Sequence, residues 1–335
     1  MERRALLQIL TVLGAGAGVP ASAVDALHAG LRQITGHASE NGADDWEQTA
    51  WDYAQGVWTE PPGSRVADLA GDIRALDQVL ARAQAPAEHA TLLRVYAQLT
   101  AFMALDLSET SRPRACWRSW RVARSVADAS GDRELSVWVR AREASDSFYL
   151  GRPGPVTDTL LDEAVRLANG KPCPGLNTAL KTRACIFAAQ GRADLTREVL
   201  GELKGAYERL PATVTDDHIS VWGVPLESIQ FTEAFALTKL GDTTAATPLV
   251  EQALAACPQE KAGGRANIGL IRAWGMVRDR EVTEGLGHAL DITTALPVTA
   301  ARRKLVGEIL SALPDRARAL PAARDLHALV IADRP

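Results

Sequence analysis

Three arginines are spaced so that their side chains share one face of a helix. Arg114, Arg118 and Arg121 stand at positions i, i+4 and i+7 of one segment. Guanidinium groups in such a row suit an acidic peptide, a phosphate or a nucleic-acid backbone. The competing interpretation is a solvated helix face with acidic neighbours. We expect the adjacent Trp117 and Trp120 to belong to the core.

No constellation typical of catalysis stands out elsewhere in the sequence. The histidines form no His-Glu-x-x-His pair, and the chain has no Gly-x-Ser-x-Gly and no Gly-x-x-x-x-Gly-Lys phosphate loop. Asp216, Asp217 and His218 could hold a metal if a further ligand approached, although a solvated loop is the simpler interpretation. We therefore expect no catalytic residues, no cofactor and no metal site.

Charge and cysteine usage narrow the choice of partners. The 335 residues carry a formal net charge of −4, whereas a chain that neutralises many phosphates normally shows a basic excess. We therefore expect no direct nucleic-acid binding. Cys116, Cys173, Cys185 and Cys257 form no Cys-x-x-Cys pair, so we expect reduced, buried thiols in a cytoplasmic protein.

The composition predicts an all-α protein. Ala and Leu dominate, hydrophobic residues make up 47%, aromatic residues only 5%, and alternating strand patterns are almost absent. Apolar residues at three- and four-residue spacing alternate with Gly, Pro and Asp breakers, whereas residues 211–223 read as a loop. Helices are predicted over 23–35, 44–58, 65–83, 86–107, 113–129, 133–150, 156–169, 175–190, 193–210, 224–240, 243–256, 264–278, 281–295, 299–312 and 318–332.

An internal repeat is the strongest signal in the sequence. Gly241, Ala246, Ala253-Leu254 and Pro258 stand in the register of the second half of a tetratricopeptide (TPR) repeat. Glycine permits the left-handed turn between two helices, and proline ends the second helix. Pro248, inside the second helix, departs from the pattern and is expected to kink it. Similar turns are predicted at Gly131, Gly151 and Gly191.

These features predict a right-handed superhelical solenoid of antiparallel helix pairs, built from degenerate TPR-like repeats. In such an array the first helix of each pair lines the concave surface, where extended peptides dock. An amide and an amine among aromatic rings suit peptide binding, because the amide bonds the peptide backbone. Counting from the turn glycines, the positions expected to face this groove are Trp138, Ser145, Thr178, Lys181, Cys185, Phe231, Asn267 and Trp274.

The order of several motifs resembles the TPR-like C-terminal region of actinobacterial helix-turn-helix (XRE-type) transcriptional regulators. The stretches that carry this resemblance are Arg3-Arg4, Trp46-Glu47 with Tyr53, Pro61-Pro62, Cys116-Trp117-Arg118, Ser130-Gly131-Asp132, Trp138, Arg142-Glu143-Ala144, Leu240-Gly241-Asp242 and Arg302-Arg303. Those regulators carry a DNA-binding domain before the twin-arginine segment, at which this chain begins. The resemblance therefore implies a sensor or interaction half, with a possible DNA-binding partner protein.

The N-terminal segment allows two interpretations. Residues 1–22 combine twin arginines, a short apolar run and Ala21-Ser22-Ala23, which is also the pattern of an export signal of the twin-arginine kind. The resemblance favours a linker remnant ahead of a TPR-like domain over 23–335. We expect a cytoplasmic protein without membrane contact, and export is the alternative.

The sequence thus predicts a regulatory module that binds a peptide or a protein segment. A scaffold that presents a peptide substrate to an enzyme of specialised metabolism is the alternative. An enzyme on a helical scaffold is a third hypothesis, and it predicts titratable groups with strongly shifted pKa values in one pocket.

Overall fold

The computed structural model describes residues 42–109 and 113–332. It divides into two compact units, Met1–Gln48 and Thr49–Pro335. Only residues 42–48 of the first unit are described, and they begin the helix α3 (Ala43–Gly56). The predicted helix over 23–35 and the segment 1–22 lie outside the described residues.

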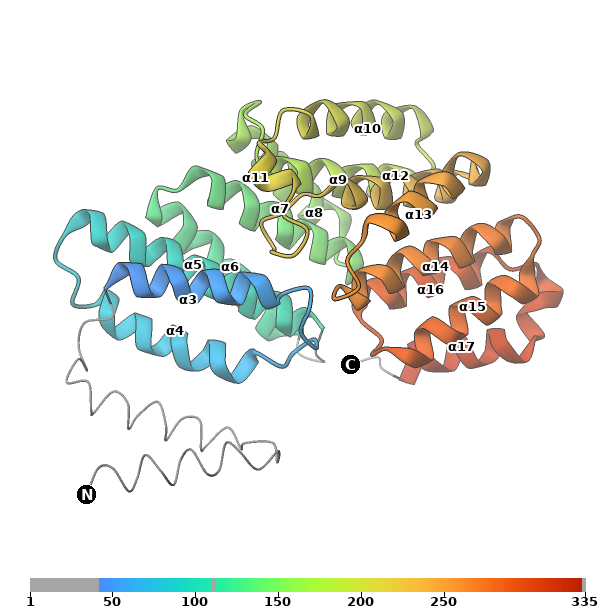
Figure 1. Ribbon diagram of the computed structural model, residues 1–335, viewed down its shortest axis with the longest axis horizontal. Helices are drawn as coiled ribbons and strands as arrows, with labels where there is room; N and C mark the ends of the chain where they lie inside the picture. The colour runs from blue at the N-terminus through green and yellow to red at the C-terminus, as the bar shows by residue number, and fades with distance from the viewer. Residues whose placement is uncertain (1–41, 110–112, 333–335) are drawn as a thin grey trace, which may run out of the picture. The chain divides into compact units, whose positions relative to one another are not determined.

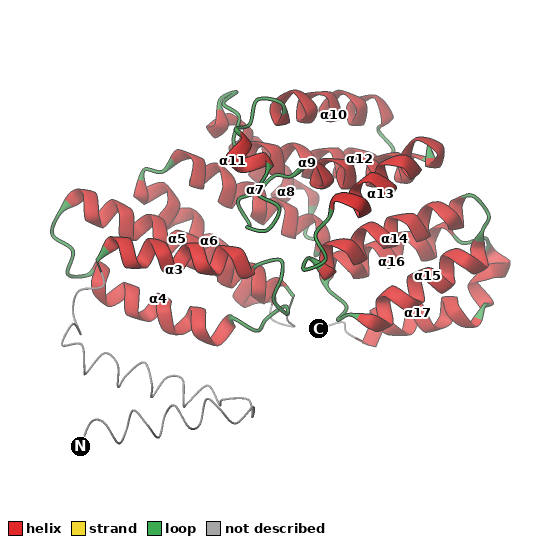
Figure 2. Cartoon of the chain, in the orientation of Figure 1, coloured by secondary structure: helices red, strands yellow, loops and turns green. Residues whose placement is uncertain are grey.

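Helices account for nearly all of the second unit (Figures 1 and 2). The described residues contain 15 α-helices and one 3₁₀-helix (Asp315–Ala319), and no strand. The helices that follow α3 are α4 (Val66–Leu80), α5 (Pro86–Ser108), α6 (Pro113–Ser130), α7 (Arg133–Tyr149), α8 (Gly154–Ala168), α9 (Pro174–Ala189), α10 (Ala193–Tyr207), α11 (Ala212–Thr215), α12 (Leu226–Leu240), α13 (Thr243–Ala256), α14 (Ala262–Arg278), α15 (Val282–Ala295), α16 (Ala300–Ala312) and α17 (Pro321–Ala332).

Consecutive helices pack in pairs, as expected of a helical repeat array. The pairs α7 with α8, α9 with α10, α12 with α13 and α14 with α15 are each joined by a tight turn. The first helices of successive pairs also contact one another, from α7 through α9 and α12 to α14 and α16. The all-α prediction is confirmed, and most predicted helix ends fall within a few residues of the observed ones.

Four of the turns within pairs share one backbone geometry. An N–H reaches back five residues to a helix carbonyl at 2.9 Å in each case, at Arg152, Arg192, Asp242 and Glu281. The residue before each donor has a positive φ, and in the first three turns it is Gly151, Gly191 or Gly241. In the fourth turn it is Arg280, with φ of 74°. The predicted turn glycines are therefore confirmed, and the fourth turn escaped the sequence pattern because it has no glycine.

Introducing a glycine at the fourth turn and removing one from the third are expected to change the free energy of unfolding in opposite directions. Arg280→Gly should stabilise the fold by about 1 kcal/mol, because it relieves a left-handed conformation that side chains disfavour. Gly241→Ala, at φ of 98°, should destabilise it by about 1 kcal/mol. Urea unfolding followed by circular dichroism measures both changes. The matched control is Gly201→Ala inside α10, where a methyl group meets nothing within 4 Å and should stabilise.

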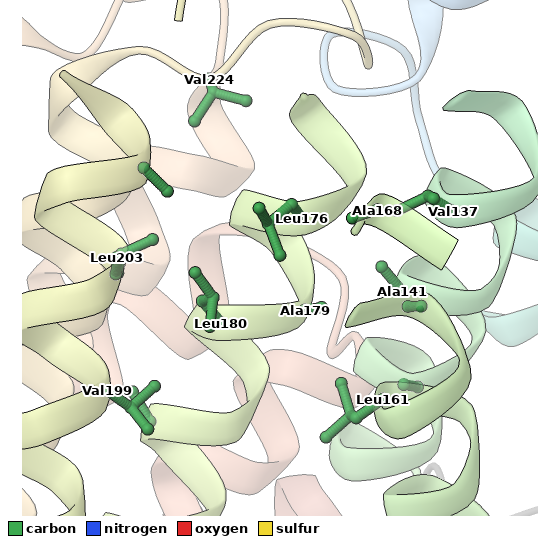
Figure 3. Packing of buried hydrophobic residues seen from close by; sticks show 14 of the residues in the cluster. Val137, Ala141, Leu161, Ala168, Leu176, Ala179, Leu180, Val199, Leu203 and Val224 are labelled. Carbon is green, nitrogen blue, oxygen red and sulfur yellow. The ribbon is translucent and has the colours of Figure 1, made fainter. Parts of the chain in front are cut away.

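Small side chains hold the inner helices close together. Figure 3 shows Ala141, Ala168 and Ala179 at the contacts between helices, with Leu161 and Leu180 filling the space beside them. All of these residues are at least 95% buried. A larger residue at the alanine positions would push the helices apart.

Segments far apart in the sequence also meet within this unit. The Glu109 carboxylate, just after α5, accepts a hydrogen bond from the N–H of Ala300 at the start of α16, at 2.8 Å. The Lys304 ammonium of α16 lies 4.2 Å from the ring centre of Phe148 in α7. The early and late helix pairs therefore contact each other directly.

The segment 211–223 is a loop over most of its length, as predicted, although it contains the short helix α11 and places Ser220 and Val221 in the interior. The helix α13 continues through Pro248 and does not end there. Within the described residues, no helix is long and apolar enough to cross a membrane.

Candidate binding cavity

One cavity brings together most of the residues predicted to face a groove. Its volume is about 560 Å³, within the range of small-molecule pockets. Its wall comes from the segment after α3, from α5, α7, α9, α12 and α14, and from the start of α16. The predicted residues that line it are Ser145, Thr178, Lys181, Cys185, Phe231 and Asn267.

The remaining two predicted residues lie in the core. Trp138 is 2% exposed, and its ring centre is 4.5 Å from that of Trp222. Trp274 is 1% exposed and packs edge-on against Phe235 at 5.6 Å. Trp138 lies on the same face of α7 as Ser145. However, the segment after α11, which contains Trp222, covers the part of α7 where Trp138 lies. The periodicity of the sequence identifies the residues that share a helix face. Only the tertiary structure decides which part of that face is left uncovered by other segments.

Two carboxylates of the cavity wall are engaged by protein groups. The Asp106 carboxylate forms a buried ion pair with Arg65, which also donates its backbone N–H at 3.2 Å. Glu109 accepts the hydrogen bond from Ala300, and burial raises the pKa of its carboxyl. The more exposed Glu60 lies 4.0 Å from the Arg65 guanidinium.

Two further carboxylates of the wall are nearly inaccessible to solvent. Asp146 accepts a hydrogen bond from Nε1 of Trp120 at 3.0 Å, and burial raises its pKa to about 7, against the effect of the Arg142 charge. Glu227 is 3% exposed, and its Oε1 lies 3.0 Å from Nδ1 of His218.

Three cations of the wall differ from these carboxylates, because they have neither an ion pair nor a side-chain hydrogen bond. Arg142, Lys181 and Lys261 come from α7, α9 and the residue before α14. Among the residues that the structure describes, no carboxylate lies within ion-pair distance of any of the three, and their side chains make no hydrogen bond. Arg302, by contrast, donates its Nε to a backbone carbonyl at 2.7 Å.

Placing these cations close together in a buried site disfavours their charged forms, and this lowers the pKa values of Lys181 and Arg142. Burial lowers the pKa of Lys181 to about 8, and the positive charges of Arg142 and Lys261 act in the same direction. Burial also lowers the pKa of Arg142. The thiol of Cys185 is held neutral, since burial raises its pKa to about 12. An anion in the cavity would relieve the mutual repulsion of the cations.

The N-terminus of α14 opens into the same cavity. Ala262, Gly263 and Gly264 line it, and Lys261 provides no side-chain cap. The first helical hydrogen bond is donated by Arg265 to Lys261 at 3.0 Å, so the three preceding N–H groups lie before it. Uncapped N–H groups at a helix start carry partial positive charge and suit an anion.

Other parts of the wall are apolar or carry polar atoms without protein partners. Trp58, Phe148 and Phe231 supply aromatic surface, and the Arg142 guanidinium lies 4.8 Å from the Trp58 ring centre. Within the described part of the chain, four lining atoms lack any hydrogen bond although they are shielded from solvent. They are Nε of Arg142, Oε2 of Glu227, Oγ of Ser228 and Oδ1 of Asn267.

A second hollow, of about 470 Å³, lies against the other side of α9. Its two arginines already have partners. Arg183 pairs with Asp162 at 2.7 Å, and the Arg192 guanidinium lies over the Phe187 ring at 5.0 Å. This hollow therefore lacks the unpaired cations of the first.

The other candidate features lie outside the cavity. Arg114, Arg118 and Arg121 are exposed on α6, whereas Trp120 is fully buried, as predicted. The neighbouring Trp117 is only half-buried. All four cysteines are buried and form no disulfide.

The acidic run before α12 folds into a turn of its own. The Asp217 carboxylate accepts the backbone N–H groups of Ile219 and Ser220 at 3.1 and 2.8 Å. Among the described residues, no three His, Cys, Asp or Glu side chains stand together as metal ligands would.

Comparisons with known proteins assign no family. No protein-family description matches the chain, and neither curated proteins nor solved structures give a significant match. The class is therefore defined by the fold itself, an all-helical protein whose helices pack in sequential pairs around a cavity.

Several lining residues that could take part in chemistry were not predicted from the sequence. Arg142, Asp146 and Tyr149 extend the face of α7 that contains Ser145, at the same three- and four-residue spacing. That spacing is a signal available in the sequence. Lys261 carried no comparable signal, because it lies in a loop whose path depends on the packing of α13 against α14.

Proposed function

We propose that this chain is a regulatory binding protein that holds a short peptide, or a segment of a partner protein, in the cavity. The observation that carries the proposal is the cavity wall, which combines aromatic surface with polar atoms that have no protein partner. Such atoms are costly when buried empty, whereas a peptide backbone supplies both donors and acceptors for them.

A regulatory role is supported by the way the cavity is built. Its wall joins α5 and α7 to α14 and α16, so a ligand would contact the early and the late helix pairs together. A ligand that binds one arrangement of these pairs more tightly shifts the population toward it. We propose that the pairs form a right-handed TPR-like superhelix, and the four equivalent turns support this proposal.

The proposed role resembles that of the sensor half of an XRE-type regulator in the cytoplasm. A separate DNA-binding protein would then bind this chain differently depending on whether the cavity holds a ligand. The motifs from Trp138 to Arg142-Glu143-Ala144 support this assignment, because they fall on α7, the helix that supplies Arg142, Ser145 and Asp146 to the wall.

Catalysis is the second candidate function, and one observation favours it. Asp146 and Lys181, with pKa values of about 7 and about 8, line the same cavity. A nucleophile normally stands within hydrogen-bond reach of its base, and Lys181 has no such base among the described residues. We therefore place binding first.

The test is to purify the full chain from its native cells and identify the retained compounds by mass spectrometry after denaturation. We expect a short peptide that is retained about tenfold less by Asn267→Ala, since one hydrogen bond to the ligand is lost. Gln190→Ala, in the second hollow, is the matched control. Equal retention by all three proteins contradicts binding in this cavity. Conversion of the retained compound to a new mass during incubation favours catalysis.

A further inference from the structure

The three unpaired cations and the start of α14 line the same cavity. Arg142, Lys181 and Lys261 reach it from three separate elements, and the charges of the other two both act on the ammonium of Lys181. The glycines Gly263 and Gly264 leave the first turn of α14 without side chains that would cover its N–H groups. Side-chain cations and helix N–H groups together recognise anionic oxygens.

The nearby carboxylates do not neutralise this cluster by direct contact. Asp146 is held by Trp120, and Oε1 of Glu227 by His218. The second oxygen of Glu227 is buried without a hydrogen bond, and its charge acts on Lys181 only from beyond ion-pair distance. The cluster is therefore positively charged at neutral pH and has no internal counter-ion in contact.

We propose that Arg142, Lys181, Lys261 and the first turn of α14 bind the C-terminal carboxylate of a peptide held in the cavity. This inference rests on the proposed peptide-binding function and adds the chemical group that is recognised. The rings of Trp58 and Phe231 then cover the apolar side chains of the same peptide.

The first experiment compares two pools of randomised tetrapeptides that differ only at the C-terminus, one with free carboxylates and one with amides. Equilibrium dialysis against the full chain, with mass spectrometry of the bound fraction, measures retention. We expect the free acids to bind about tenfold or more tightly than the amides, because charge-assisted hydrogen bonds to the carboxylate are lost in the amide.

The variant Lys181→Met distinguishes loss of carboxylate binding from loss of folding. The variant should bind acids and amides alike, yet its melting temperature without ligand should be higher than that of the wild type. The reason is that Lys181, with a pKa of about 8, carries a buried charge at pH 7 that the fold disfavours. Lys171→Met removes an exposed lysine that does not line the cavity, and it should keep the preference for acids.

A pH series tests the charge of Lys181 directly. Sulfate stays doubly charged at neutral and alkaline pH, so a rise in melting temperature with sulfate, relative to chloride at equal ionic strength, reports anion binding. This rise should shrink as the pH passes about 7, where Asp146 ionises, and again above about 8, where Lys181 loses its proton. In Lys181→Arg the second step should be absent. The other charged or titratable groups that act on Lys181 are Arg142, Cys185, Glu227 and Lys261, whereas Tyr149 and Lys304 interact with the neighbouring Cys185.

The outcomes separate this inference from the proposed function. Equal binding of acids and amides by the wild type would overturn the carboxylate site and leave peptide binding intact. Stabilisation by sulfate that is lost in Lys181→Met, with no peptide bound, would support an anion site and overturn the peptide function. Absence of both effects would overturn both proposals.

Discussion

Asp106→Ala is expected to destabilise the protein by about 3–5 kcal/mol, because it leaves a buried guanidinium without its counter-charge. The side chains of Arg65 and Asp106 are 7% and 4% exposed. Arg65 donates to Asp106 from its backbone N–H and from its side chain, and to the carbonyl of Tyr53 at 3.2 Å. After the substitution only that carbonyl and the more distant Glu60 remain.

Urea unfolding followed by circular dichroism measures this loss against a surface pair. Asp162→Ala breaks an ion pair whose carboxylate is 77% exposed, and it should change the unfolding free energy by at most about 1 kcal/mol. Replacing both buried partners, as Arg65→Met with Asp106→Leu, should recover most of the stability, because no unpaired charge remains. Similar losses in Asp106→Ala and Asp162→Ala would mean that water reaches the Arg65–Asp106 pair.

Trp274→Ala is expected to lower stability by about 3–5 kcal/mol, the range for removing a large aromatic side chain from a core. Trp274 is 1% exposed and touches the ring of Phe235, and the Lys239 ammonium lies 5.9 Å from its ring centre. The loss comes from the missing contacts and the void that remains. A residue that merely faced a groove would show little change in stability.

Two variants distinguish the core role of Trp274 from a ligand contact. Trp274→Phe should destabilise less than the alanine variant, because the buried indole N–H has no hydrogen-bond partner among the described residues. Trp51→Ala, at a tryptophan that is 55% exposed, should change stability by at most about 0.5 kcal/mol. Thermal unfolding and peptide retention are measured on the same samples. Unchanged stability with lost retention in Trp274→Ala would place this residue in the binding site after all.

Much of the secondary structure follows from local chemistry. Gly151, Gly191 and Gly241 mark turns that need a positive φ, and the apolar spacing between them gives helix positions to within a few residues. The turn at Arg280 could not be predicted in this way. There a residue with a side chain adopts the left-handed conformation because the surrounding helices fix the turn, whereas local residue preferences favour glycine at such a position.

Part of the candidate site was also predictable from the regular spacing of residues on helix faces. Ser145, Lys181 and Asn267 lie on helix faces that repeat geometry selects, and they do line the cavity. Trp138 shares such a face, yet Trp222 covers it. Trp222 lies in a segment that the sequence describes only as a loop, and loops carry no periodicity from which their path could be predicted.

By itself, the sequence determined an all-helical chain, the pairing of consecutive helices and the faces that each helix offers. These properties depend on contacts three to five residues apart and on the φ angles of single residues. The tertiary structure alone decided that α16 meets α7 and the residue after α5, which cations share a cavity and which of them lack a counter-ion. Those features depend on how the side chains of neighbouring helices pack at each interface, which involves residues far apart in the sequence.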